Sequence, residues 1–88
     1  MGTIALTYDD IVRSVESIVR DLAGDEQVAI WPEQLEQDRV GFVIVSRAFA
    51  NMTHLERQQR LWEAIREKLG PGAVRVAAIF PRTPDEVV

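Results

Sequence analysis

Apolar residues recur at helical spacing in two stretches of the chain, and the first stretch follows Thr7. Thr7 and Asp10 have the spacing of a capping box, in which a hydroxyl and a carboxylate satisfy free backbone donors at a helix start. Gly24 predicts the helix end, because glycine adopts the left-handed conformation at low cost. The apolar stripe between these signals consists of Ile11, Val15, Ile18, Val19 and Leu22.

The second helical stretch begins with another predicted capping box, formed by Thr53 and Glu56. Gly70-Pro71-Gly72 stops this helix after Leu69. The positions expected on its inner face, or next to that face, are Leu55, Leu61, Trp62, Ile65 and Leu69.

Three short apolar runs predict strands at residues 27–31, 40–45 and 73–80. Pro32 should halt the first strand, because proline offers no N–H to a ladder. The second run is almost entirely apolar, which indicates a strand covered on at least one face. In the third run, Val74, Val76, Ala78 and Phe80 are expected on one face.

The element order predicts one small α+β domain spanning residues 1–88. The order is α-β-β-α-β-α. The last helix, of barely one turn, is predicted from Thr83-Pro84-Asp85-Glu86. We expect a three-stranded mixed sheet with its helices on one face. The first two strands suit a hairpin, and the long helix suits a right-handed crossover to a parallel third strand.

Composition narrows the class of protein. The 88 residues include no cysteine, which excludes disulfides, thiolate metal ligands and a nucleophilic thiol. No apolar run approaches the ~20 residues that span a bilayer, and the first residues lack a secretory signal pattern. We therefore expect a cytoplasmic protein that does not enter a membrane.

Charge is unevenly distributed along the chain. Residues 1–46 carry nine acidic and three basic side chains, whereas residues 47–82 carry seven basic and three acidic ones. An acidic first half and a basic second half can steer an acidic partner to one side of the molecule. A solvated surface of mixed charge is the alternative interpretation.

The second half of the chain resembles BolA-like proteins. The similarity rests on Ser46-Arg47-Ala48-Phe49, on Arg57 with the helix that follows it, and on Thr83-Pro84-Asp85-Glu86. Asn51 stands where the family usually has glycine, and asparagine is the next residue best able to adopt a positive φ. The resemblance implies the BolA-like topology, which is comparable to that of type II KH domains.

The chain departs from the family at its histidines. Gln58 replaces the motif histidine, Arg75-Val76 replaces His-Ala, and Phe80 replaces the histidine that can ligate an iron–sulfur cluster shared with a glutaredoxin. Amides and phenyl rings are poor cluster ligands. We therefore expect no cofactor and no metal site, and we interpret Phe80 as packing in a former ligand pocket.

No catalytic site is evident in the sequence. His54 is the only histidine and is expected on the surface near a helix start. The chain has no glycine-rich phosphate loop, and Ser46 has no base or orienting acid in its sequence context. These observations predict a protein that is not an enzyme.

A basic face is the candidate site for a partner. The residues proposed to form it, for nucleic acid or an acidic protein, are Arg47, Arg57, Gln58, Arg60, Arg75 and Arg82. Glutamates on the same helix could instead pair with these arginines. Trp31 is the one aromatic side chain expected to be exposed, whereas Phe42, Phe49 and Trp62 are expected in the core.

Two classes of function compete. The first is a regulatory module that binds nucleic acid or protein through the basic face. The second, implied by the resemblance, is an adaptor of a monothiol glutaredoxin in iron–sulfur homeostasis that supplies no cluster ligands of its own. The third alternative is a purely structural or interaction role, for example as a homodimer formed through the first strand or the C-terminal helix.

Overall fold

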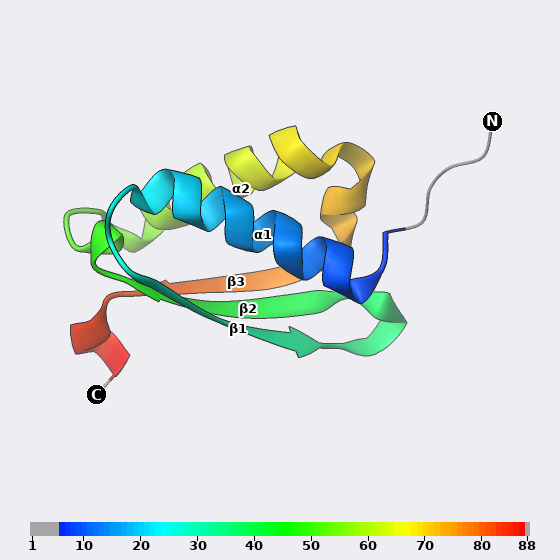
Figure 1. Cartoon of the computed structure of the whole chain (residues 1–88), viewed down its shortest axis with the longest axis horizontal. Coiled ribbons are helices and arrows are strands. Elements are labelled where there is room, and N and C mark those ends of the chain that lie inside the picture. Colours follow the sequence, from blue (N-terminus) through cyan, green and yellow to red (C-terminus); the bar gives the residue numbers. More distant parts are fainter. Residues whose placement is uncertain (1–5, 88) are drawn as a thin grey trace.

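The computed structural model describes residues 6–87, and the N-terminal stretch examined for a secretory signal lies largely outside that range. Its main elements are α1 (Tyr8–Ala23), β1 (Val28–Gln34), β2 (Val40–Ser46), α2 (His54–Leu69) and β3 (Val76–Arg82). Both helices cover one face of the three-stranded sheet (Figure 1). The predicted α+β fold is confirmed, and the predicted last helix is a 3-10 turn, η4 (Pro84–Val87).

The strands follow the order β1-β2-β3 in the sheet. β1 and β2 form an antiparallel hairpin, whereas β2 and β3 are parallel and are connected through α2. The β2–β3 register shifts between Val40 and Gly41, so that Val40 pairs with Val76 and Gly41 pairs with Ala78. The sheet is therefore mixed, as predicted, and carries an irregularity at the start of β3.

Both helices begin and end where the sequence predicts. Thr7 with Asp10 and Thr53 with Glu56 form complete capping boxes, in which each side chain bonds the other residue's backbone N–H. Gly24 and Gly70 end the helices with φ values of 63° and 54°. These positive values favour glycine, since a β-carbon is strained there.

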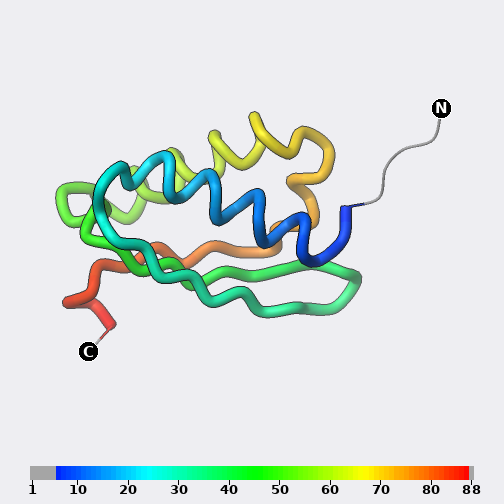
Figure 2. Tube along the Cα trace, in the orientation of Figure 1, coloured from blue at the N-terminus to red at the C-terminus, as the bar shows by residue number. Residues whose placement is uncertain are grey.

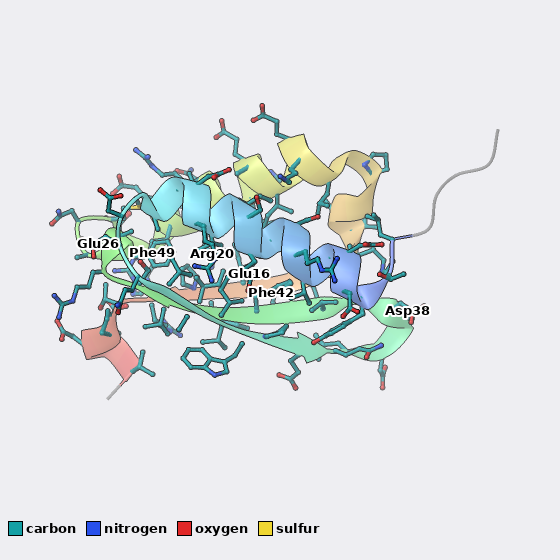
Figure 3. All side chains as sticks on the ribbon, in the orientation of Figure 1. Glu16, Arg20, Glu26, Asp38, Phe42 and Phe49 are labelled. Atoms are coloured by element: carbon teal, nitrogen blue, oxygen red, sulfur yellow. The ribbon has the colours of Figure 1, made fainter. Side chains whose placement is uncertain are left out.

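The core lies between the helices and the sheet. Figure 3 shows Phe42 between α1 and the sheet, with Phe49 at one end of this layer and Asp38 at the tip of the β1–β2 hairpin at the other end. The buried apolar side chains come from every main element and are Ile11, Val15, Ile18, Val19, Ala23, Val40, Phe42, Ile44, Phe49, Leu61, Ile65, Val76 and Ile79.

Two helix positions were predicted wrongly. Leu22 was expected in the apolar stripe of α1, but its side chain is 43% exposed. Leu55 was expected on the inner face of α2, but its side chain is 66% exposed. The inward positions of α2 are instead Arg57, Leu61 and Ile65, at intervals of four residues. Trp62 is only partly buried and packs against the edge of the core.

The strand boundaries differ from the predictions at Pro32 and at Ala73. β1 continues through Pro32 to Gln34, since β1 is an edge strand that tolerates a missing donor. Residues 70–75 form a 3-10 helix, so β3 begins at Val76 and Val74 is exposed.

The predicted common face of β3 is also wrong. The register shift turns Val76 and Ile79 toward the core and leaves Phe80 exposed.

Asn51 does not adopt the positive φ expected from its family position. Among the described non-glycine residues, Gln37 and Asp38 adopt it, in the β1–β2 turn.

Candidate binding surface on the open face of the sheet

The face of the sheet opposite the helices is not covered by another layer of the described chain (Figure 1). Side chains alternate across a strand, so Val40, Phe42 and Ile44 point to the helices and Val43 points to the open face. Val43 pairs with Trp31 of β1 and with Phe80 of β3. These three residues form a continuous row across the open face, which we call the apolar row.

All three side chains of the apolar row meet solvent. Trp31 is 55% exposed, Val43 37% and Phe80 47%. The exposure predicted for Trp31 is confirmed. The interpretation of Phe80 as packing in a converted pocket is wrong, because its ring lies on the uncovered face of an edge strand. Aromatic side chains exposed together in this way are typical of binding surfaces.

Both edges of the sheet are unsuited to pairing with another strand. β1 contains Pro32 and β3 contains Pro81, and neither residue has an N–H to donate. On β3, the Ile79 carbonyl accepts a hydrogen bond from the Gln58 side chain at 2.9 Å, and the Pro81 carbonyl accepts one from Arg57 at 3.3 Å. A partner is therefore more readily received on the open face than at a strand edge.

Arg57 is an internal clamp rather than a surface residue. Its side chain is 4% exposed, and its Nε donates to the carbonyls of Phe49 and Met52 at 3.1 and 3.2 Å. The two terminal nitrogens reach the Glu86 carboxylate at 2.7 and 3.2 Å. Arg57 thereby fastens the β2–α2 connection and η4 to α2. Arg57 therefore does not belong to the predicted basic face, because its N–H groups donate hydrogen bonds within the protein.

The carboxylate of Glu86 complements this clamp. The hydrogen bonds from Arg57 and from the Thr83 backbone N–H lower the pKa of Glu86 to about 2. Glu86 is therefore ionised at neutral pH and balances the charge of Arg57. The predicted pairing of glutamates with arginines within α2 is replaced here by a pair that joins α2 to η4.

Gln58 and Arg75 are also engaged in internal contacts. The Gln58 side chain bonds the Ile79 carbonyl and accepts a hydrogen bond from the Trp62 indole at 3.0 Å. Arg75 donates to the backbone carbonyls of Asp38 and Leu6. Asp38 and Phe49 lie at opposite ends of the molecule (Figure 3), so Arg75 and the Arg57 clamp are far apart. The six predicted residues do not form one face.

Arg47 and Arg82 are the two predicted arginines that the structure brings to one end of the sheet. Arg82 pairs with Val45 on the strand register and follows Phe80 on the open face. Arg47 directly follows β2 and lines an open depression of about 840 Å³ with Ala29, Val45 and other residues. Neither guanidinium has a hydrogen bond or ion pair within residues 6–87. We call this end of the sheet the arginine end.

Other charged residues set the context of the arginine end. Asp25, Glu26 and Arg20 line the same depression as Arg47. Glu33 lies at the opposite end of β1 and pairs with Gly41. Arg60 lies beside Leu22 in the helical layer, away from the open face. The open face therefore has Glu33 at one end, whereas arginine and acidic side chains lie together at the other end.

Figure 2 shows η4 on the side of the sheet that faces away from the helices, next to the end of β3. Pro84 of this turn borders the depression that contains Arg47. η4 therefore forms a wall at the arginine end, and the Arg57–Glu86 pair holds that wall in place.

Sequence reasoning missed Val43 and Phe80 as surface residues. The continuous apolar run of β2 predicted a strand covered on at least one face and did not show which side chains stay exposed. The register shift that exposes Phe80 depends on pairing with β2. One available signal was the sequence Phe80-Pro81-Arg82, because a proline within an apolar run indicates an edge strand.

Comparison of the chain with protein-family models and with curated proteins finds no match.

His54 is exposed at the start of α2, as expected. Within the described range, no three His, Cys, Asp or Glu side chains are grouped so as to hold a metal ion. No helix in that range is long and apolar enough to cross a bilayer.

Proposed function

We propose that this protein is a non-catalytic, BolA-like binding module that contacts nucleic acid at the arginine end of its open sheet face. The observation that supports the proposal is the position of Arg47 and Arg82 at one end of the sheet. Their guanidinium groups have no hydrogen bond or ion pair within residues 6–87, and Arg82 follows the exposed Phe80 on the same face. Arginine suits phosphate because its planar donors can bond two oxygens at once.

The site is smaller than the basic face expected from the sequence. Arg57, Gln58 and Arg75 hold the fold together, and Arg60 lies in the helical layer. The Arg57–Glu86 pair contributes by fixing η4 beside the site. Binding should consequently be weak and only modestly dependent on salt, since only a few phosphates are neutralised.

A salt-dependent titration with a matched pair of variants tests this function. Two phosphate contacts to a single strand should reduce affinity about sevenfold between about 50 and 200 mM salt. Arg82→Gln should weaken binding and reduce the salt slope, whereas Arg60→Gln, on the other side of the molecule, should do neither. Equal effects of the two substitutions, or no nucleic-acid binding by the wild-type protein, would contradict the proposal.

A monothiol glutaredoxin is the second candidate partner, and the exposed apolar row is the observation that favours it. Trp and Arg are enriched at protein interfaces. The test mixes this protein with a cluster-free and a cluster-loaded glutaredoxin and follows elution volume and visible absorption. A ligand-free adaptor should form a complex without changing the cluster spectrum, and an altered spectrum would contradict that role.

A further inference from the structure

We infer that the open face binds a single strand of nucleic acid, with bases stacked on Trp31 and Phe80 and phosphates held at the arginine end. This inference rests on the proposed function and specifies the ligand of the same surface. It assigns the stacking role to residues of the sheet face rather than to a groove between a helix and a strand edge.

The register gives the spacing of the two rings. Trp31 and Phe80 each pair with Val43, so they stand two strand spacings apart, about 9–10 Å. Val43 is smaller than either ring and separates them, and about half of each aromatic residue is exposed. Such a platform receives two bases that are spread apart, which is the conformation that single strands adopt on sheets with exposed aromatics.

Arg82 lies next to this platform. It follows Phe80 by two residues on the same face of β3, a displacement of about 6.6 Å along the strand. That separation suits a nucleotide whose base lies on Phe80 and whose phosphate lies at Arg82. Glu33 repels phosphate at the opposite end of the face, whereas at the arginine end Arg47 and Arg82 can bond phosphate beside Asp25 and Glu26.

The size of the surface favours this ligand over a folded protein. Three strands of seven residues give a face of about 14 by 23 Å, or roughly 330 Å². A stable protein interface buries about 800 Å² of accessible surface on each partner, so a globular protein or a second copy would have to extend beyond this face. The prolines in both edge strands disfavour a peptide added as a fourth strand.

The geometry also discriminates between single and double strands. In a duplex the base faces are stacked on each other, so rings fixed on a flat sheet cannot reach them. The phosphates of a duplex remain accessible to arginine. Removing a ring should therefore affect single-strand binding alone, whereas removing Arg82 should affect both forms.

The experiment measures fluorescence anisotropy of a short labelled DNA strand of mixed sequence, alone and annealed to its complement. The variants are Trp31→Leu and Phe80→Leu, with Leu55→Ala as a matched control because Leu55 is an exposed apolar residue on α2. Circular dichroism verifies that each variant folds. Each ring substitution should weaken single-strand binding by at least about fivefold, and the control should not.

The possible results separate this inference from the proposed function. If strand and duplex bind alike and the ring substitutions have no effect while Arg82→Gln weakens both, the stacking inference is overturned and the proposed function stands. If neither form binds, both proposals fail. If sedimentation shows a dimer that Trp31→Leu dissociates, a second copy covers the face, and the stacking inference is overturned.

Discussion

The two faces of β2 carry similar apolar side chains but meet different surroundings. Val40, Phe42 and Ile44 are buried under the two helices, whereas Val43 points to solvent between two exposed rings. The two helices cover only one face of the sheet, and apolar side chains also lie on the second face. The proposed binding function rests on this difference, because exposed apolar side chains grouped on one face are typical of interaction surfaces.

The two arginines near the end of β3 differ in the same way. Arg57 uses its donors on three backbone carbonyls and on Glu86, and it is buried. Arg82 has no such contact among residues 6–87 and lies next to Phe80 on the open face. One arginine is a structural element and the other is available to a ligand, although both looked alike in the sequence.

The largest expected effect comes from comparing Phe42 with Phe80. Phe42→Ala should lower the free energy of unfolding by about 3–5 kcal/mol, because it leaves a cavity beneath α1. Phe80→Ala should cost only about 1 kcal/mol, because nearly half of that ring is already in water. Urea denaturation followed by circular dichroism measures both. Similar losses would show that the open face is covered in solution.

The second comparison replaces Arg57 and Arg60 by methionine. Arg57→Met should lower the free energy of unfolding by about 2–4 kcal/mol, since buried carbonyls lose their donors and Glu86 loses its partner. Arg60→Met should change it by no more than about 0.5 kcal/mol, because Arg60 is exposed. The same denaturation experiment applies. An equal, small effect of both would mean that the clamp contributes little.

The helices were predictable because their signals are local. Capping boxes and terminal glycines depend on residues within one turn, and the stripe of α1 falls on the buried positions Ile11, Val15, Ile18 and Val19. The prediction for Leu55 was wrong because Arg57 occupies the inner face of α2. The groups that accept hydrogen bonds from Arg57 lie in other segments of the chain. A buried arginine cannot be expected from periodicity alone.

The candidate site was less predictable than the fold. The exposure of Phe80 follows from a register shift between β2 and β3, and that pairing joins residues far apart in the sequence. The separation of Arg75 from Arg57 likewise depends on the positions of Asp38 and Phe49 in space. Sequence therefore identified Trp31 and the basic residue types but not which arginines share a surface.

The smallest expected effect is a dependence of stability on acid, centred on Glu86. Its pKa in the folded protein is about 2, below the ordinary value of 4.5, so folding favours the ionised form. The stabilisation is present above pH 4.5 and is lost as pH falls toward 2. Glu86→Gln removes this contribution, so the difference in stability between wild type and variant should be largest near neutral pH and should shrink through that interval.

Two other carboxylates must be separated from this effect. Asp10 and Glu56 have lowered pKa values because each accepts the backbone N–H of its capping threonine, so they add an acid dependence of the same sign to both proteins. The free energies of unfolding of wild type and Glu86→Gln are therefore compared at successive pH values. The contributions of Asp10 and Glu56 are the same in both proteins and disappear from the difference. Asp85→Asn is the matched control, since Asp85 lies in the same turn but its carboxylate has no hydrogen bond or ion pair within residues 6–87. A difference that stays constant down to pH 2 would show that the carboxylate of Glu86 acts by shape rather than by charge, and that Arg57 holds η4 through its carbonyl contacts alone.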